Sequence, residues 1–264
     1  MAPTRRSRDL LRGKNVLIIG GTSGIGFAVA QLVIEHGAMA CIAGSNPTKL
    51  GKALDALKQH PDRDPIAIVQ SATCDLFDVP NLEQNLDNLL KLAAGDSKIH
   101  HIVFTAADMV QPPPLASVTI EQIQRVGTIR FTAPMLVAKL LPKYMELCPE
   151  NSYTLTSGSH AKQPDPGWSL VTGYCGGVEG LMRGLAVDMM PLRVNVVSPG
   201  AVLTPVLRDI LGDSLEIALD AARKKSTTGR IARPEDVAEA YLYIMKDQNI
   251  TGTVLETSAG MLLR

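Results

Sequence analysis

The sequence carries no excess of charge of either sign, because 26 lysines and arginines are balanced by 26 aspartates and glutamates. Proteins that bind nucleic acid favour a basic face, so this balance argues against a nucleic-acid partner. The sequence also lacks any apolar run of the roughly 18 residues that span a bilayer. We therefore expect neither nucleic acid nor a membrane among its partners.

Cysteine is scarce, and the four cysteines show no close pairs. This spacing argues against a disulfide framework or a zinc site and is typical of reduced thiols in an intracellular protein, so we expect a cytoplasmic location. Residues 1–14 are basic but lack the apolar stretch of a signal peptide. We interpret them as a solvated leader, with a nucleic-acid-binding arm as the alternative. The cysteines are Cys41, Cys74, Cys148 and Cys175.

What the sequence does have is 45% apolar residues over 264 positions, enough for one large domain with a buried core. Short β-rich runs alternate with longer helical ones, which predicts an α/β fold with a doubly wound parallel sheet of the Rossmann type. No linker or repeat divides the chain, so we expect residues 15–264 to form a single domain. Strands are predicted at residues 16–19, 38–43, 66–72, 99–105, 152–156, 194–197 and 253–257.

The helical segments alternate with these strands. Pro134 is expected to kink the longest of them. Proline recurs over residues 163–168, which excludes a helix there and predicts a loop. Helices are predicted at residues 25–36, 49–59, 82–94, 120–145 and 171–190, with a helical lobe over residues 205–246.

A glycine-rich turn joins the first predicted strand to the first helix, with the spacing Gly20-x-x-x-Gly24-x-Gly26. Gly20 permits the tight turn, and the other two glycines let a pyrophosphate and the strand approach the helix closely. Backbone N–H groups and the helix dipole then face the anion. This context favours a dinucleotide site over a merely structural turn. The residues expected to bind the cofactor here are Gly20, Thr22, Ser23, Gly24, Ile25 and Gly26.

The second predicted strand lacks the acidic residue that an NAD enzyme usually places at its end to bind the ribose 2′-hydroxyl. Gly44 leaves room there, Ser45 and Asn46 can donate hydrogen bonds, and Lys49 is near. Arg63, before the third strand, is a further candidate. This pattern favours NADP(H), and the alternative is that Ser45 and Asn46 serve ordinary turn chemistry.

The spacing of the glycine turn resembles that of the short-chain dehydrogenase/reductase family, and the resemblance extends over nearly the whole chain. It includes Asp75 and Leu76, at the position where the family's aspartate contacts adenine. It also includes residues 193–200 with Val202 and Thr204, the segment that clasps the nicotinamide amide. The resemblance implies a nicotinamide cofactor, a small-molecule substrate and assembly into a homo-oligomer, either a dimer or a tetramer.

Two family motifs are degraded. Ile19 stands in the first turn where threonine is usual. After the fourth predicted strand, Phe-Thr-Ala-Ala at residues 104–107 stands where the family has Asn-Asn-Ala-Gly, which leaves Ala106 as the expected cofactor contact there.

The residues that normally run the family's chemistry are missing. Family members protonate a carbonyl oxygen with the Tyr of a Tyr-x-x-x-Lys pair on one helix face. The gap-free match over residues 178–186 places Val171 at the Tyr position and Cys175 at the Lys position. Tyr174 has Val178 four residues on, so it lacks a lysine partner, and we interpret it as a packing residue.

The family's Asn and Ser positions are altered as well. Arg130 falls at the Asn position. The Ser position falls at about Gly158, with Ser157 and Ser159 adjacent, so its register is open. With at least three of four residues gone, we do not expect carbonyl reduction by the usual route.

An iminium acceptor would escape this loss, because it is already cationic and becomes neutral without a proton donor, whereas a carbonyl develops an alkoxide. Such a site needs a carboxylate and an apolar or aromatic wall. Asp165 and the sole tryptophan, Trp168, offer both in the Pro-rich loop. The alternatives are a solvated aspartate in a turn and a tryptophan in the core. Arg130 needs an anion, which could be Asp165, a substrate oxygen or a cofactor phosphate.

Together, Arg130, the lost Tyr/Lys pair and the sequence Pro-Asp-Pro-Gly-Trp at residues 164–168 resemble the fungal reductase/Diels–Alderases of bridged prenylated indole alkaloids of the malbrancheamide and paraherquamide type. The resemblance implies NADPH-dependent reduction of a cyclic iminium derived from a prenylated tryptophan and proline. An intramolecular [4+2] addition then gives a bicyclo[2.2.2]diazaoctane. It makes Asp165 the acid/base and cation partner, with Arg130 and Trp168 beside it. The alternatives are an inactive NADP-binding sensor or scaffold, and a carbonyl reductase that uses Tyr174.

Overall fold

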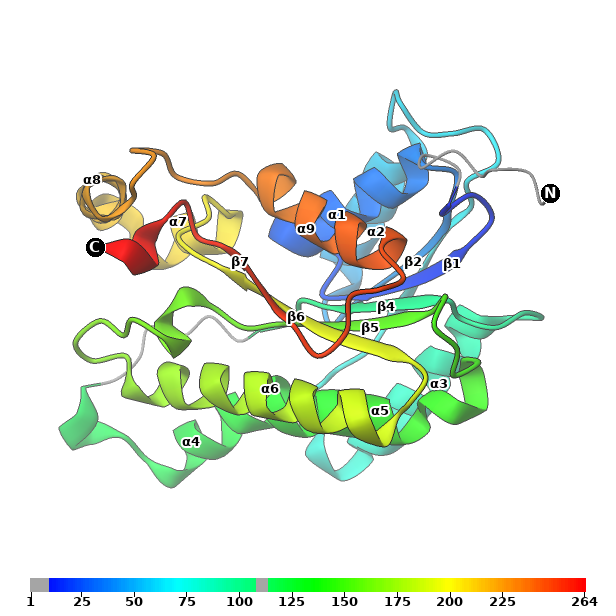
Figure 1. Ribbon diagram of the computed structural model, residues 1–264, viewed down its shortest axis with the longest axis horizontal. Helices are drawn as coiled ribbons and strands as arrows, with labels where there is room; N and C mark the ends of the chain where they lie inside the picture. The colour runs from blue at the N-terminus through cyan, green and yellow to red at the C-terminus, as the bar shows by residue number, and fades with distance from the viewer. Residues whose placement is uncertain (1–9, 108–113) are drawn as a thin grey trace.

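Figure 1 shows the fold as a computed structural model, described for residues 10–107 and 114–264. Seven parallel strands form one sheet in the order β3-β2-β1-β4-β5-β6-β7. All five residues of β1 are buried, as expected for a strand with both faces covered by helices. This architecture confirms the predicted doubly wound α/β fold. The strands are β1 (Asn15–Ile19), β2 (Met39–Gly44), β3 (Val69–Thr73), β4 (His101–Phe104), β5 (Ser152–Thr156), β6 (Arg193–Pro199) and β7 (Val254–Thr257).

Helices cover both faces of the sheet, with α1, α2 and α9 on one side and α3, α5 and α6 on the other (Figure 1). Helices α7 and α8 stand apart from these layers, beyond the carboxyl ends of the strands, at the left of Figure 1. The helices are α1 (Gly24–Glu35), α2 (Pro47–Lys58), α3 (Leu82–Ala94), α4 (Ile120–Gly127), α5 (Ala133–Tyr144), α6 (Ser169–Asp188), α7 (Pro205–Leu211), α8 (Leu215–Lys225) and α9 (Pro234–Lys246).

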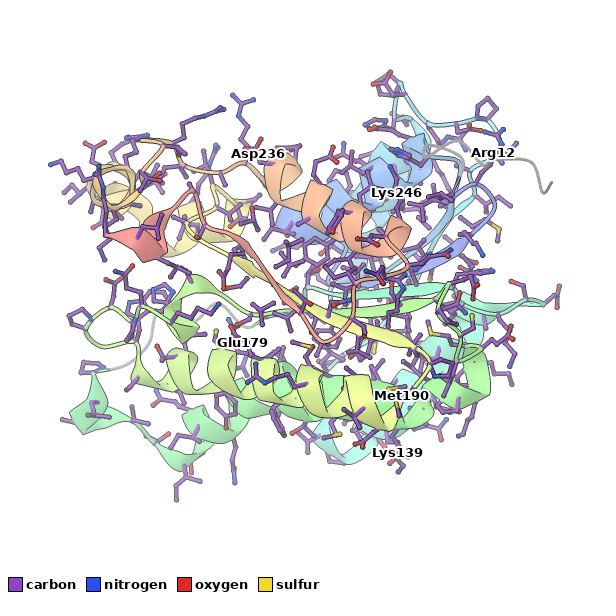
Figure 2. All side chains as sticks on the ribbon, viewed as in Figure 1. Arg12, Lys139, Glu179, Met190, Asp236 and Lys246 are labelled. Carbon is purple, nitrogen blue, oxygen red and sulfur yellow. The ribbon has the colours of Figure 1, made fainter. Side chains whose placement is uncertain are left out.

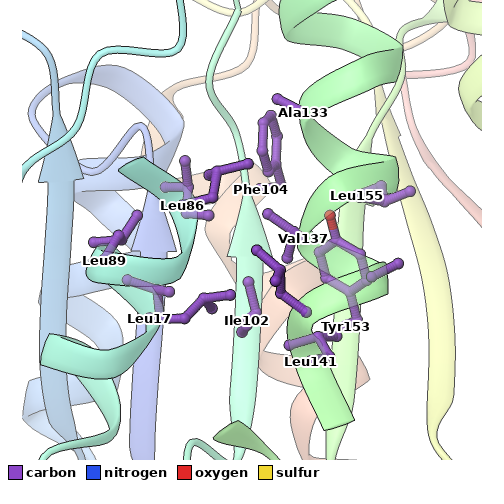
Figure 3. Close-up of a cluster of buried hydrophobic side chains, with 14 of the residues drawn as sticks. Leu17, Leu86, Leu89, Ile102, Phe104, Ala133, Val137, Leu141, Tyr153 and Leu155 are labelled. Atoms are coloured by element: carbon purple, nitrogen blue, oxygen red, sulfur yellow. The ribbon is translucent and has the colours of Figure 1, made fainter. Parts of the chain in front are cut away.

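A buried apolar cluster fixes each helical layer to the sheet. Figure 3 shows part of one cluster, in which Leu86 and Leu89 of α3 and Val137 of α5 lie against the strand residues Ile102 and Leu17. Burial of such side chains from water is the main force that holds the layers together. The strand ends that carry the site are therefore anchored in a close-packed core.

The predicted helix over residues 120–145 is interrupted, although not at Pro134. A π-helical turn, η4 (Thr128–Thr132), separates α4 from α5 and contains Arg130. Pro134 lies in the first turn of α5, where a missing N–H group is tolerated. The expectation of a kink caused by Pro134 is therefore wrong, and the interruption lies at the residue of chemical interest.

The described part of the predicted leader is not simply solvated. Leu11 is fully buried in the core, and Arg12, labelled in Figure 2, forms an ion pair of 2.5 Å with Asp64. Residues 1–9 of that prediction lie outside the described residues.

The predicted lobe over residues 205–246 is also shorter than expected, because α9 packs against α1 and the sheet. The buried face of α9 belongs to one of the two core clusters, so this helix is part of the main domain and not of the lobe. Within residues 10–107 and 114–264, we find no helix with the length and apolar character needed to cross a membrane.

Candidate active site

A cavity of about 860 Å³ lies at the carboxyl ends of β1, β4, β5 and β6. In an open α/β sheet this edge, at the point where the strand order reverses, is where ligands bind. Here the order reverses between β1 and β4. The lining comes from the glycine turn, the loops after β4, β5 and β6, the start of α6, and helices α7 and α8.

The glycine turn forms one wall through close backbone packing. Gly20 has φ +95°, and a Cβ there would lie 2.5 Å from the backbone nitrogen of Ala106. A Cβ on Gly26 would overlap the Gly20 carbonyl and Thr105 Oγ1. Ser23 makes no side-chain cap to α1, so the first N–H groups of α1 face the cavity without a side-chain acceptor, an arrangement that fits a pyrophosphate. The lining residues of this wall are Gly20, Thr22, Ser23, Gly24, Ile25, Gly26 and Ala106.

The residues predicted to contact the adenine and nicotinamide ends also line the cavity. Asp75 and Leu76 follow β3, and Asp75 Oδ1 accepts a hydrogen bond of 2.9 Å from the backbone of Phe77, which fixes the loop. Val202 and Thr204 follow β6. Thr204 Oγ1 accepts a hydrogen bond of 3.2 Å from the backbone N–H of Leu207 and so caps α7. These contacts place both segments against the same space.

Only part of the predicted 2′-phosphate site lines the cavity. Ser45 does so, but the Asn46 side chain accepts 2.9 Å from the backbone of Lys49 and caps α2, as in the turn-chemistry alternative. Arg63 donates a hydrogen bond of 2.8 Å to the Ala67 carbonyl of its own loop. It does not line the cavity.

Gly44 lines the cavity at the end of β2, and the expectation that it leaves room for a phosphate stays a prediction. A Cβ on Gly44 would lie 2.6 Å from Thr22 Cγ2, so a larger residue at position 44 would displace the Thr22 side chain.

Val171 and Cys175, at the expected Tyr and Lys positions on α6, both line the cavity. Burial raises the pKa of the Cys175 thiol, so it remains a neutral, weakly polar group. Gly158 lies opposite, with the position of its Cβ 3.8 Å from Cys175 Sγ. The Oγ of neighbouring Ser157 lies within hydrogen-bond distance of two acceptors, the Cys175 carbonyl oxygen at 3.2 Å and Glu179 Oε1 at 3.3 Å. The face that normally protonates a carbonyl is therefore without a proton donor from α6.

Tyr174 points away from this face. Its hydroxyl donates a hydrogen bond of 3.0 Å to the Ile123 carbonyl of α4, and its ring packs against Gly127. Among the described residues, no tyrosine lines the cavity. The packing interpretation of Tyr174 fits this geometry.

Asp165 lines the cavity from the loop that leads into α6. Its Oδ1 accepts a hydrogen bond from Lys225 Nζ of α8, and its Oδ2 lies 3.4 Å from His160 Nε2. The Lys225 hydrogen bond, despite some desolvation, lowers the pKa of Asp165 from its usual value of 3.8. The carboxylate is therefore charged at neutral pH. It is 41% exposed but has two partners in the protein, so the choice between a catalytic and a solvated aspartate stays open.

His160 and Trp168 form a flat wall beside this carboxylate. Their ring centroids lie 4.2 Å apart, with planes 12° from parallel, and both residues line the cavity. Burial lowers the pKa of His160 below its usual 6.5, although Asp165 opposes this shift, so the imidazole is neutral at pH 7. Trp168 is half-buried at the start of α6, and the core alternative for it is wrong.

Arg130 also lines the cavity but does not hold Asp165, which pairs with Lys225 instead. Its Nε is buried and has no hydrogen-bond acceptor anywhere in the described part of the chain. A buried guanidinium nitrogen without an acceptor is costly, so this position fits an anionic or carbonyl oxygen of a bound molecule. A substrate oxygen and a cofactor phosphate both meet that need.

The comparison with known families agrees with this geometry. The model of the SDR-like Rossmann domain matches residues 8–264. The chain belongs to the short-chain dehydrogenase/reductase family. Membership makes it an oxidoreductase-type protein with a nicotinamide-cofactor site, which the strand order and the glycine turn have already located.

Relatives of this SDR chain include fungal enzymes. It is 37% identical to the short-chain dehydrogenase/reductase fsr5 of Gibberella fujikuroi over all of both chains. It is 35% identical to ATR9 of Stachybotrys chlorohalonatus, covering 96% of this chain and 99% of that one. A solved structure, that of the MalC reductase/Diels–Alderase from Malbranchea aurantiaca, is 99% identical, covers 99% of this chain and 100% of that chain, and has a TM-score of 0.95.

The sequence patterns did not reveal two residues that line this SDR site, Lys225 and His160, nor Glu179, which contacts the lining residue Ser157. Lys225 could not be found, because it lies 60 residues beyond Asp165 and no spacing links them. His160 had a signal, since it precedes Asp165 in the same loop. Glu179 is a buried carboxylate on the side of α6 that faces the sheet, where it accepts from Ser157 (Figure 2). A charged residue on the apolar face of a predicted helix is the signal that would have found it.

Proposed function

We propose that the chain reduces a cyclic iminium, derived from a prenylated tryptophan and proline, with NADPH and then directs an intramolecular [4+2] addition to a bicyclo[2.2.2]diazaoctane indole alkaloid. The reductase and Diels–Alderase activity follows from 99% identity to the MalC reductase/Diels–Alderase over nearly the full length of both chains. The substrate class and the roles of individual residues are supported by the site.

The observation that carries the proposal is that this cavity lacks the family's tyrosine proton donor but contains a carboxylate. Helix α6 presents Val171 and Cys175 to the cavity in place of the Tyr/Lys pair, and the loop before α6 presents the charged carboxylate of Asp165. A carbonyl acceptor needs a proton donor, whereas a cationic acceptor needs a carboxylate. The bound nicotinamide cofactor supplies the hydride. Asp165 holds the cationic end of the substrate near it and can later accept or return a proton.

The cycloaddition needs no acid or base from the side chains, because holding a diene and an alkene in reactive contact is enough to accelerate the reaction between them. The cavity offers apolar walls for this purpose. The lining includes Trp168, Leu207 and Leu211 of α7, and Leu219 of α8. We propose that these side chains fold the prenyl group over the ring system and set the face of addition.

A preference for NADPH over NADH is part of the proposal. The end of β2 contributes Ala43, Gly44 and Ser45 to the cavity, and none of these carries the carboxylate that would repel a 2′-phosphate. Ser45 can donate to that phosphate. The Asn46 and Arg63 side chains are already hydrogen-bonded to the backbone within the protein.

The deciding experiment measures NADPH oxidation by the purified chain with a prenylated cyclic iminium and, separately, with a ketone of similar size. We expect oxidation with the iminium only, accompanied by the bridged product. Oxidation with the ketone would point to an atypical carbonyl reductase. Binding of NADPH without oxidation by either compound would point to a sensor or scaffold.

A further inference from the structure

The Asp165–Lys225 ion pair joins two walls of the same cavity. Asp165 comes from the loop before α6, and Lys225 lies at the end of α8 in the lobe beyond the sheet. Both residues line the cavity, with side chains 41% and 47% exposed, respectively. The carboxylate proposed to receive the substrate is therefore already engaged by a cation of the protein.

The two oxygens of Asp165 have different partners. Oδ1 accepts from Lys225, and Oδ2 faces His160 Nε2 at 3.4 Å. His160 is held in place by its stack on Trp168. Lys225 is a point charge on a flexible stem with its side chain half in water, so it is the partner that can leave.

We propose that Lys225 is a positioning and selectivity residue whose ammonium occupies Asp165 until a cationic substrate replaces it. The proposal rests on the function above, in which Asp165 holds the iminium cation. A cationic ligand gains the carboxylate when Lys225 withdraws, whereas a neutral ligand of the same shape gains nothing. His160 stays on Oδ2 throughout and keeps the carboxylate oriented.

The surrounding charges favour this exchange over simultaneous binding. Within residues 10–107 and 114–264, the cationic side chains that line the cavity are Arg130 of η4 and Lys225 of α8, and the acidic ones are Asp165 and Asp75. Near Asp165, a bound cation would meet Lys225 at close range. Like charges in contact repel, so Lys225 must move aside for a cation to reach Asp165.

The first test is binding of a fixed cation, N-methyl-3,4-dihydroisoquinolinium, to the protein saturated with NADP⁺, which cannot reduce the probe. Calorimetry with K225M should show about threefold to fivefold tighter binding than the parent, the scale of a half-exposed ion pair. K224M, a change at the exposed neighbour on α8, is the matched control and should bind like the parent. The neutral 1,2-dihydronaphthalene should not distinguish the variants. Equal or weaker cation binding by K225M would overturn the proposal.

The second test does not depend on any ligand. Trp168 is the only tryptophan and stacks on His160, so we expect its emission to fall when the imidazole is protonated. Asp165 raises the pKa of His160, while Lys225 and Arg130 lower it. K225M should therefore move the midpoint of the emission titration to higher pH, and K224M should not. An unmoved midpoint in K225M would show that Lys225 does not govern this site.

The variant D165N separates the two proposals. If D165N binds the cation and reduces the iminium like the parent, the proposed function of Asp165 fails. If D165N loses both while K225M behaves like the parent, only the role of Lys225 fails. If the exchange operates, the gain from K225M should shrink when measured in the D165N background, because the shared carboxylate is gone.

Discussion

The imidazole of His160 lies flat against the indole of Trp168, with ring centroids 4.2 Å apart, while its Nε2 faces the carboxylate of Asp165 at 3.4 Å. One residue thus contacts both the aromatic wall and the charged group of the cavity. The stack limits rotation of the imidazole, so the direction of its contact with Asp165 depends on Trp168. Shape and charge at this site are coupled through His160.

Trp168→Leu should therefore change the product more than the rate. We expect hydride transfer to fall by about tenfold or less, and the ratio of stereoisomeric bridged products to drop clearly, because the aromatic wall that folds the substrate is gone. NADPH oxidation and chiral chromatography of the products check the two effects. A variant with unchanged product ratios would show that the indole does not shape the substrate.

Asp165→Asn should bind NADPH normally and lose reduction by roughly a hundredfold or more, the scale of a positioned acid or base. Asparagine keeps the shape but removes the charge. Because the pKa of Asp165 is lowered from 3.8, its charge is fully present above that value and is lost only as the pH falls through the lowered pKa. The parent rate should therefore show no loss from this group between pH 5 and 8, as a pH profile of NADPH oxidation would reveal. Near-parent turnover in the variant would contradict the mechanism.

Ser45→Asp should shift the ratio of NADPH to NADH affinity toward NADH by about tenfold or more, because the new carboxylate repels a 2′-phosphate. Position 44 is unsuited to this test, since a Cβ there would lie 2.6 Å from Thr22 Cγ2. Fluorescence titration with each cofactor measures the ratio. Ser45→Asn supplies the uncharged control, and equal affinities in the parent would refute the preference.

Tyr174→Phe should leave iminium reduction unchanged, because the hydroxyl bonds the Ile123 carbonyl outside the cavity. We expect a loss of about 1 kcal/mol or less in the free energy of unfolding from this one hydrogen bond. Turnover and denaturant unfolding of the same sample measure both. A large fall in turnover with unchanged stability would indicate that Tyr174 donates a proton in the reaction.

Local patterns determined much of this protein. The doubly wound sheet follows from alternating strand and helix signals, and the glycine turn from residues that are neighbours in sequence, since Gly20 and Gly26 must bring one strand and one helix together. The loss of the Tyr/Lys pair was readable in the same way, because Val171 and Cys175 lie one helical turn apart on α6 and both face the cavity.

Tertiary structure alone decided the partners. Arg130 and Asp165 were expected as a possible pair, but the π-helical turn leaves Arg130 Nε without an acceptor in the described chain, and α8 brings Lys225 to Asp165 from 60 residues away. The Thr22 side chain lies beside Gly44 for the same reason. A sequence specifies which groups are present and which face of an element they share. The distance between two such groups depends on how separate elements pack, and that packing sets which charge neutralises which.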